Sequence, residues 1–547
     1  ETQHHQLNHI TTIKRIPFEG HVWLDRFTIR NLEIFFPNTV EGKCLIDVID
    51  HTISPMGGRL LKRWLALPST DSELIFKRHN IVEYFINKEK HRSFLIETLS
   101  SLSDLERLVS KVATKKINPR ELFTLNESLK NIKPLKNEFK KTTSDDLNSL
   151  FKSLSNCDEI INLIGSTLSE TPPVNIIKGN TISSDFSNEL KELRSLSKNN
   201  KDFLDDMLKE QSEITNIPSL KISSNNVFGY YIEVRNTHKD KVPESWIRKQ
   251  TLVNAERYIT EELKEYESKI LGAEQRIMEL EMKIFDELLN SRQSHIKEIQ
   301  NNSSIIAELD CLVSFSSLSV LKNYVRPEID DSFDIEIING KHPVIESQLP
   351  IDKPYIPNSI YLNKKNQQII MITGPNMSGK SAILRQTAII CLLAQIGCFV
   401  PAEKLKMGII DKIFTRVGAS DNISMGESTF MVEMNETALI LNNISERSLI
   451  LLDEIGRGTS TYDGISIAWA ISEYLHQHHS KPKTLFATHY HELNQMKDSF
   501  ERIKNFNVSI KEENNQILFL RKLIPGSSEH SFGIHVAKMA GMPKDVL

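Results

Sequence analysis

The chain has 547 residues, of which 39% are hydrophobic and 25% are charged, and a chain of this length is expected to fold into several domains. No uninterrupted run of about 18 or more apolar residues is present, which excludes a membrane span. The formal net charge of −4 argues against a uniformly basic nucleic-acid-binding protein, although local basic patches remain compatible with it.

Cysteine usage and the chain ends bear on compartment and completeness. The five cysteines are scattered and lack C-x-x-C spacing, which fits a reducing cytoplasmic compartment and predicts neither disulfides nor structural zinc. The histidines at 476, 478 and 479 lie in a polar segment, which we interpret as a solvated loop rather than a metal site. The chain begins at Glu1 without Met and stops at Leu547 within a helical pattern, which indicates a fragment.

The first part of the chain reads as mainly helical. Residues from about 15 to 120 combine short apolar runs with helical spacing, which predicts a helical core. Residues 171–185 contain paired prolines, a glycine and several serines, which predicts a loop. A longer helical pattern follows from Phe186 to Ile214.

A second long helical pattern starts at Leu263. Its apolar residues step by three and four positions, as in a coiled-coil seam. A helix from Leu263 to Gln300 would be roughly 55 Å long at about 1.5 Å per residue. The two long helices bracket residues 216–262, so we expect a pair of lever arms with a small domain at their tips.

The bracketed insertion reads as β-structure. Its segment from Val227 to Val234 alternates, with Tyr230, Ile232 and Val234 on one face. The basic residues around it include Lys221, Arg235, Lys239, Lys241, Arg248 and Lys249. Such residues protect a solvated strand edge or neutralise DNA phosphates, and spacing alone favours the strand edge.

A phosphate-binding pattern follows the apolar run Ile369 to Ile372. The pattern G-x-x-x-x-G-K-[ST] is formed by Gly374, Pro375, Asn376, Met377, Ser378, Gly379, Lys380 and Ser381. Its glycines allow a tight loop whose N–H groups point at phosphates, with Lys380 reaching the β- and γ-phosphates and the Ser381 hydroxyl holding Mg²⁺. The sequence therefore predicts a nucleoside triphosphate site.

Two further apolar runs end in groups that suit phosphate hydrolysis. The run from Leu449 ends at Asp453, placed to bind Mg²⁺ through water, and Glu454, placed to polarise the attacking water. The run from Thr484 ends at His489, whose side chain would contact the γ-phosphate or the water. Each run alone is also typical of a core strand, and a lone histidine at a strand end is usually structural.

Four segments together resemble the ATPase domain of the MutS family of DNA mismatch-repair proteins, and the similarity extends from Glu1 to Pro543. The segments are Thr373 to Ser381, Ser428 to Met434, Asp453 to Gly464 and Ala487 to Tyr490. The resemblance implies an ABC-type ATPase that uses ATP and Mg²⁺, in which two subunits share two composite sites. Within the motif, Ala382 stands where the family usually has Thr, but the metal-binding hydroxyl is the preceding Ser381.

The resemblance also implies roles for residues outside the loop. Ser428 belongs to a signature loop that reaches the partner subunit's γ-phosphate, and Tyr355 occupies the position of an aromatic residue that stacks on adenine. Packing at the domain edge is the alternative for Tyr355. Residues 456–464 resemble the loop that crosses the dimer interface and couples the two sites.

The same resemblance assigns the insertion to a DNA clamp, with Lys239, Lys241, Arg248 and Lys249 as phosphate contacts. It implies a homodimer on double-stranded DNA, a downstream factor of the MutL type, and a bacterial cytoplasmic location. The family's mismatch-reading Phe-x-Glu motif belongs to an N-terminal domain; the match Phe285-Asp286-Glu287 falls inside the second long helix and lacks that context.

The expected fold is a multidomain α+β protein with a helical core, lever helices, a β-rich clamp and an α/β ATPase domain. The expected divisions are a connector end (1–14), core and lever (15–215), clamp (216–262), lever return (263–326), ATPase (327–527) and a truncated helix-turn-helix (528–547). Two alternatives stay open: a related protein acting on recombination intermediates, and a structural ABC-type ATPase of the chromosome-organising kind.

Overall fold

The structure is a computed structural model that describes residues 20–198, 200–225, 229–290, 295–350, 352–375, 378–417, 429–513, 516–527, 537 and 540–546. The described residues form two compact units, one of residues 103–134 and 155–302 and one of residues 20–102, 135–154 and 303–546. Both helices and several sheets are present, which confirms the α+β class.

The first unit is mostly helical and carries one sheet. Its helices are α6 (Leu105–Ala113), α7 (Pro119–Lys130), α10 (Asp158–Thr167), α11 (Asn188–Lys198), α12 (Asn200–Thr215) and α13 (Glu261–Asn290). Its strands are β2 (Lys221–Asn225), β3 (Gly229–Arg235), β4 (Ile247–Thr251) and β5 (Ala255–Ile259), with the 3₁₀ helices η2 (Ile176–Lys178) and η3 (Asn236–Lys241).

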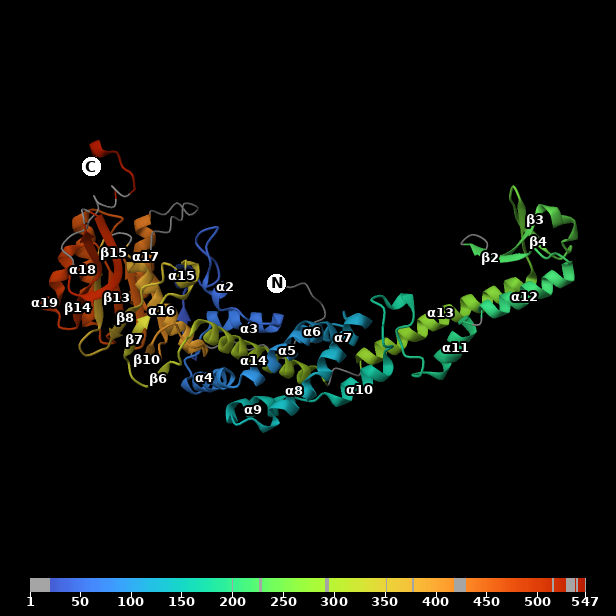
Figure 1. Ribbon diagram of the computed structural model, residues 1–547, viewed down its shortest axis with the longest axis horizontal. Helices are drawn as coiled ribbons and strands as arrows, with labels where there is room; N and C mark the ends of the chain where they lie inside the picture. Colours follow the sequence, from blue (N-terminus) through green and yellow to red (C-terminus); the bar gives the residue numbers. More distant parts are fainter. Residues whose placement is uncertain are drawn as a thin grey trace. The chain divides into compact units, whose positions relative to one another are not determined.

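The four-stranded sheet lies against the ends of α12 and α13 (Figure 1). Its order is β2-β3-β5-β4, so β4 is an edge strand. Ile232 and Val234 of β3 pack with Met207 of α12 and Leu263 of α13 in one buried cluster. The β-structure predicted for this segment is therefore present, and its apolar face forms a core with the two long helices.

Two sequence predictions for this unit need correction. The second long helix does not continue to Gln300, because α13 ends at Asn290 and His295 is a turn residue before the next helix. In the sequence, the apolar seam stops at Leu289 and the next apolar residue is Ile296. The predicted loop at 171–185 contains the short helix η2.

The second unit contains more helices and strands than the first. Its helices are α1 (Arg26–Asn31), α2 (Leu45–Ile49), α3 (Pro55–Ala66), α4 (Ser72–Asn87), α5 (Glu89–Ser101), α9 (Asp145–Ser153), α15 (Pro343–Gln348), α16 (Lys380–Ile396), α17 (Thr429–Asn442), α18 (Thr461–Gln477) and α19 (Met496–Ser499). Two more helices, α8 (Ile132–Glu138) and α14 (Ile296–Lys322), cross the division between the units, and the short 3₁₀ helices are η1 (Phe139–Lys141), η5 (His491–Gln495) and η6 (Lys544–Val546).

Two sheets organise this unit. The strands are β1 (Trp23–Leu24), β6 (Glu328–Asp330), β7 (Ile335–Gly340), β8 (Asn358–Leu362), β9 (Ile369–Thr373), β10 (Lys404–Gly408), β11 (Lys412–Arg416), β12 (Ser448–Asp453), β13 (Lys483–Ala487), β14 (Ile503–Glu513) and β15 (Gln516–Pro525). The larger sheet has the order β1-β11-β12-β13-β9-β14-β15, and the smaller has β6-β10-β7-β8. The strands predicted before the phosphate loop and before Asp453 and His489 are confirmed as β9, β12 and β13.

The larger sheet is covered on both faces. Ala468, Ile471 and Leu475 of α18 pack on a face that includes Ile450 and Phe486. Helix α16 lies on the opposite side of the sheet (Figure 1), and almost all of its side chains are buried. The central strands β9, β12 and β13 are buried along their whole length, as expected for parallel strands between two helical layers.

Helix α14 is the one helix of the described residues that is long and apolar enough to cross a membrane, with a mean hydropathy of 1.6. However, 72% of that apolar window is buried inside the protein. Its Asp310 accepts hydrogen bonds from the backbone N–H of Ile53 at 2.9 Å and of Ser54 at 2.7 Å, just before α3. These contacts are those of a core helix.

Candidate functional site

Three neighbouring parallel strands bring the motifs together. β13 lies between β12 and β9, and all three run in the same direction. Their carboxyl ends therefore meet at one edge of the sheet, where ligands bind in open α/β sheets. Gly374 follows β9, Asp453 ends β12 and His489 follows β13 closely, so residues far apart in the sequence lie side by side.

The phosphate loop turns sharply between β9 and α16. Gly374 and Gly379 have φ values of 147° and 100°, which favour glycine at both positions. Gly379 is the N-cap of α16, and the helix begins at Lys380. The N-terminus of a buried helix thus opens toward the loop, as an anion site requires. Asn376 and Met377 lie outside the described residues.

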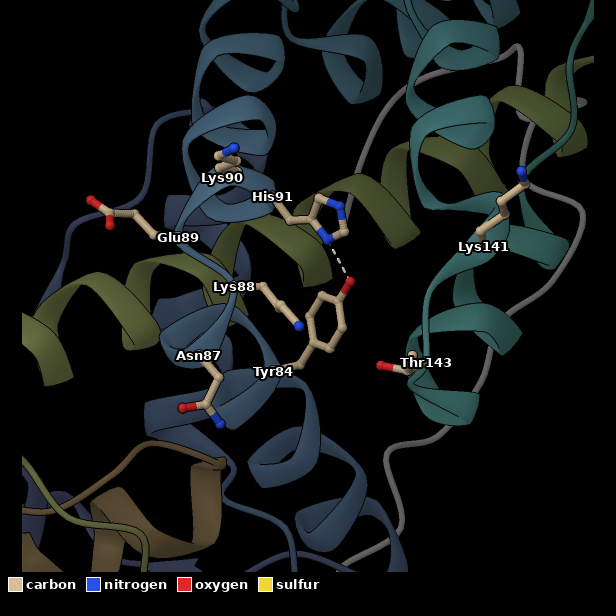
Figure 2. A pocket seen from close by; sticks show the side chains of 8 residues that line it. All are labelled: Tyr84, Asn87, Lys88, Glu89, Lys90, His91, Lys141 and Thr143. Atoms are coloured by element: carbon tan, nitrogen blue, oxygen red, sulfur yellow. Dashed lines mark hydrogen bonds between the residues drawn. The ribbon is translucent and has the colours of Figure 1, made fainter.

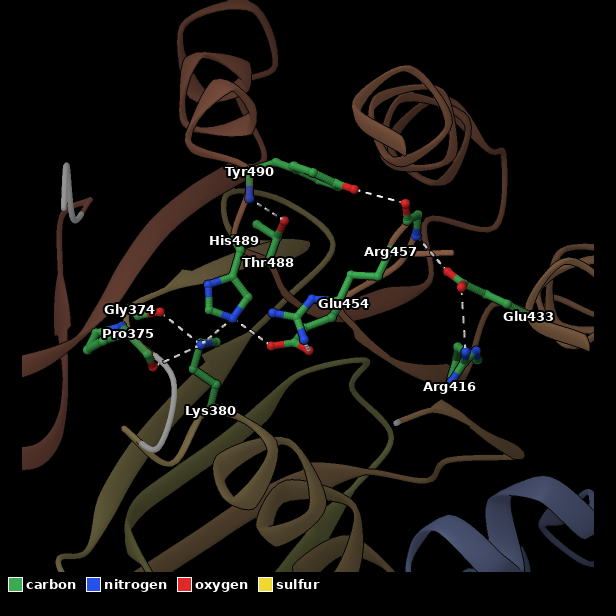
Figure 3. A network of polar contacts seen from close by, with 11 residues as sticks. Gly374, Pro375, Lys380, Arg416, Glu433, Glu454, Arg457, Thr488, His489 and Tyr490 are labelled. Carbon is green, nitrogen blue, oxygen red and sulfur yellow. Dashed lines mark hydrogen bonds and ion pairs between the residues drawn. The ribbon is translucent and has the colours of Figure 1, made fainter. Parts of the chain in front are cut away.

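Lys380 is buried within this loop (Figure 3). Its Nζ donates to the carbonyl oxygens of Gly374 at 2.8 Å and Pro375 at 3.1 Å. Burial lowers the pKa of Lys380 to about 8, although the charges of Glu454 and Asp453 oppose the shift. The ammonium group is therefore held by the loop's own carbonyls at the position from which it would reach a phosphate.

Each oxygen of the Glu454 carboxylate contacts one nitrogen-bearing side chain, His489 or Arg457. Its Oε1 lies 2.7 Å from His489 Nε2, and its Oε2 lies 2.5 Å from Arg457 Nη1. Burial raises the pKa of Glu454, but the hydrogen bond from His489 and the charge of Arg457 outweigh it and leave that pKa below its ordinary value. A carboxylate at this position stays ionised and is able to accept a proton.

His489 Nε2 also lies 3.2 Å from Lys380 Nζ. One ring nitrogen cannot donate to Glu454 and accept from Lys380 at once. The contact to Glu454 is shorter and involves a carboxylate, whereas Lys380 already has two carbonyl acceptors. We therefore assign the proton to Nε2, so that His489 donates to Glu454.

Asp453 and Ser381 form the third part of the site. Burial raises the pKa of Asp453, and a hydrogen bond from the Ser381 side chain partly offsets this. Among the described residues, Asp453 Oδ1 and Ser378 Oγ are buried without a hydrogen-bond partner. Such orphaned oxygens are rare unless a ligand or water completes them. A carboxylate and a hydroxyl beside a phosphate site suit Mg²⁺, which is usually bound through one or two carboxylates plus substrate phosphates.

Tyr355 lies close to the start of α16. It lines a small cavity with Gly379, Ala382, Ile383 and Arg521, and its hydroxyl donates to Gln386 Oε1 at 3.0 Å. Burial raises the pKa of this hydroxyl. The structure thus places Tyr355 beside the phosphate loop, which fits a role at the base of a nucleotide. Ser428 lies outside the described residues.

The structure adds residues to which the sequence analysis gave no role. Glu433 accepts a hydrogen bond from the backbone N–H of Gly456, and Tyr490 donates to the carbonyl of the same residue (Figure 3). Arg416 pairs with Glu433. Glu433 and Tyr490 lie inside two of the four segments that resemble the MutS family, which was the available signal, but only the folded chain shows their partners.

The basic residues of the insertion are exposed. Lys239 and Lys241 belong to η3, and Arg248 and Lys249 to the edge strand β4. Arg248 lies 3.3 Å from Glu256, and Lys241 donates to the Asn216 carbonyl at 3.4 Å. Lys239 and Lys249 have no ion pair among the described residues. The geometry fits phosphate contacts, but also a solvated edge.

Two other features lie apart from the phosphate loop. A cavity of about 430 Å³ is lined by Tyr84, Asn87, Lys88, Glu89, Lys90, His91, Lys141 and Thr143, with the Tyr84 hydroxyl 2.5 Å from His91 Nδ1 (Figure 2). None of the site residues predicted from the sequence lines this cavity.

The segment with His476, His478 and His479 was predicted to be a solvated loop. The structure shows that it is only partly a loop, because His476 belongs to the last turn of α18 and His478 caps that helix.

Comparison with known proteins finds two profiles of the MutS family that match this chain. A profile of MutS domain III matches residues 27–316, and one of MutS domain V matches residues 370–547. The chain is 62% identical to the DNA mismatch repair protein MutS of Christiangramia forsetii and 60% identical to that of Flavobacterium johnsoniae. Each match covers 100% of this chain and 63% of the relative, so the chain spans a little under two thirds of their length.

Proposed function

Because the chain belongs to the MutS family, we propose that it hydrolyses ATP to ADP and phosphate and uses this to switch its hold on duplex DNA in mismatch repair. The observation that carries the proposal is the meeting of Lys380, Asp453 and Glu454 at one edge of the larger sheet. The relatives are named DNA mismatch repair proteins, and this chain is 62% and 60% identical to two of them over its whole length.

Binding begins at the phosphate loop. Lys380 exchanges the carbonyls of Gly374 and Pro375 for the β- and γ-phosphate oxygens, which compensates its buried charge more fully. Ser381 and Asp453 would hold Mg²⁺, and the bound ion would supply positive charge beside the phosphates. The orphaned oxygen of Asp453 supports this assignment. Tyr355 stacks on adenine at the other end of the nucleotide.

Hydrolysis depends on Glu454. Its carboxylate orients a water molecule toward the γ-phosphate and accepts the proton that this water loses. His489 keeps the carboxylate turned toward Lys380 by donating to its Oε1. Arg457 holds the second oxygen. These two partners also keep Glu454 ionised.

We assign the dimer and the clamp from the family. Ser428 of one subunit would complete the nucleotide site of a second copy. The insertion, residues 216–262, would form the clamp, with its exposed basic residues on DNA phosphates. By the same family resemblance we assign residues 15–215 and 263–326 to the helical core and lever, and residues 327–527 to the ATPase domain. ATP occupancy would set the clamp's grip on DNA.

The chain covers part of the length of its relatives, and we propose that mismatch reading resides in a part that it does not cover. Two measurements on this chain test the proposal. Steady-state ATP hydrolysis should be detectable and should require Mg²⁺ and Glu454. Gel-shift affinities for matched and mismatched duplex should be similar; a strong mismatch preference would contradict the assignment of mismatch reading to other residues.

A further inference from the structure

Glu433 is a buried carboxylate with a different partner on each oxygen. It lies on α17 and its side chain is only 5% exposed. Oε1 accepts a hydrogen bond from the backbone N–H of Gly456 at 2.5 Å, and Oε2 lies 3.6 Å from Arg416 Nη2. A buried carboxylate is costly unless it is paired, so these contacts fix its position.

Arg416 anchors this carboxylate to the sheet. It is the last residue of β11, next to β12 in the larger sheet, and it also pairs with Glu436 at 3.1 Å. Its side chain is 7% exposed. One guanidinium therefore holds two carboxylates one turn apart on α17, and the first of them reaches the loop that follows β12.

That loop carries Glu454 in an unusual backbone conformation. Glu454 has φ of 59° and Gly456 has φ of 90°. A side chain at Gly456 would lie 2.7 Å from the Gly464 backbone, so the two chain segments touch closely. A non-glycine residue in the left-handed region persists only where its surroundings hold it there.

The backbone N–H and the backbone carbonyl of Gly456 each form a hydrogen bond with a side chain. Glu433 accepts from its N–H, and the Tyr490 hydroxyl donates to its carbonyl at 2.9 Å. Tyr490 directly follows His489, the residue that binds the Glu454 carboxylate. The backbone two residues after Glu454 and the carboxylate itself are therefore fixed from neighbouring elements (Figure 3).

We propose that Glu433, held by Arg416, and Tyr490 are positioning residues that set the orientation of Glu454 for water activation. The inference rests on the proposed ATPase function and deepens it. Neither residue needs to touch the nucleotide; each acts on the peptide groups of Gly456. Their loss should therefore lower kcat through Glu454 and leave ATP binding intact.

The test compares Tyr490→Phe, Glu433→Ala and Glu433→Gln with the unaltered chain. Tyr490→Phe removes only a hydroxyl, and we expect it to lower kcat by about fivefold or more with the KM for ATP nearly unchanged. Glu433→Ala should lower kcat by about tenfold or more, whereas Glu433→Gln keeps an acceptor for Gly456 and should recover most of that loss. Thermal unfolding and nucleotide affinity, measured in parallel, show that each variant is folded.

A double-variant cycle separates positioning from a general structural effect. In a Glu454→Gln background the carboxylate is already absent, so adding Tyr490→Phe should cause little further loss. Losses that add fully in that background, or a normal kcat in both Tyr490→Phe and Glu433→Ala, would overturn the positioning role. If the unaltered chain fails to hydrolyse ATP, the proposed function and this inference fall together; hydrolysis that these variants leave unchanged removes only the inference.

Discussion

His489 and Glu454 are joined by a hydrogen bond of 2.7 Å between Nε2 and Oε1, formed across the ends of two neighbouring strands. Replacing His489 with Ala removes the donor that helps keep the pKa of Glu454 low. Glu454 accepts a proton only when ionised, so activity is lost as pH falls through its pKa. We expect the acidic limb of the kcat profile to move to higher pH in His489→Ala. An unmoved limb would contradict the contact's role.

Glu454→Gln should retain ATP binding and lose turnover. The amide keeps the size of the side chain but cannot accept a proton, and general bases typically contribute about 10² to 10⁴ in rate. Single-turnover hydrolysis and fluorescent-nucleotide binding measure the two properties separately. Glu446→Gln is a matched control, because its side chain is exposed and pairs with Lys364 rather than with the site. Near-normal turnover by Glu454→Gln would reject the assigned role.

Lys380→Ala should lose both nucleotide binding and turnover, since the buried ammonium is the only phosphate-binding side-chain cation that we assign to the loop. An equilibrium binding measurement with ATP and with ADP is decisive. ATP affinity close to that of the unaltered chain would contradict the assignment. The unfolding temperature should not fall, because the variant also removes a buried charge.

Nucleotide affinity should depend on pH above about 8. The pKa of Lys380 is about 8 in the structure, because burial disfavours the charged form. Phosphates favour that form, so binding takes up a proton at higher pH and affinity falls as pH rises, by at most about tenfold per unit. Titrations of ADP between about pH 7 and 9 test this. In Lys380→Arg any remaining affinity should show much less of this dependence, because a guanidinium does not titrate there.

Asp453→Asn should raise the Mg²⁺ concentration needed for half-maximal turnover. The carboxylate contributes charge to a hard cation, and its Oδ1 is buried without a partner among the described residues. The amide should fold at least as well, since burial already raises the pKa of Asp453. Turnover measured against Mg²⁺ at saturating ATP checks this. An unchanged Mg²⁺ requirement would place the metal on other groups.

The clamp assignment predicts a change in the salt dependence of DNA binding. Replacing Lys239, Lys241, Arg248 and Lys249 with Ala should weaken duplex binding and reduce the slope of log K against log salt by up to about 3 to 4, at roughly 0.9 per phosphate contact. Lys130 and Lys133, which pair with acidic neighbours in the same unit, serve as control positions. An unchanged slope would favour the solvated strand edge.

The sequence determined the local chemistry of this protein. Gly374, Lys380 and Ser381 stand in one contiguous motif whose geometry is fixed by its own backbone, and the apolar runs before Asp453 and His489 have the composition of buried strands. The alternation in β3 likewise predicted a sheet with one buried face. Such features depend on short-range sequence patterns, so they can be predicted without knowledge of the fold.

Only the tertiary structure decided which distant groups meet. The order β11-β12-β13-β9 brings Arg416, Glu454 and His489 to one sheet edge, and no spacing in the sequence specifies that order. The partners of Lys380 and the hold of Glu433 on Gly456 follow from it. The structure also shows a turn at His295, within the range over which the seam predicted one continuous helix. The sequence motifs identify the reacting side chains, but long-range packing determines the distances between these side chains and their pKa values.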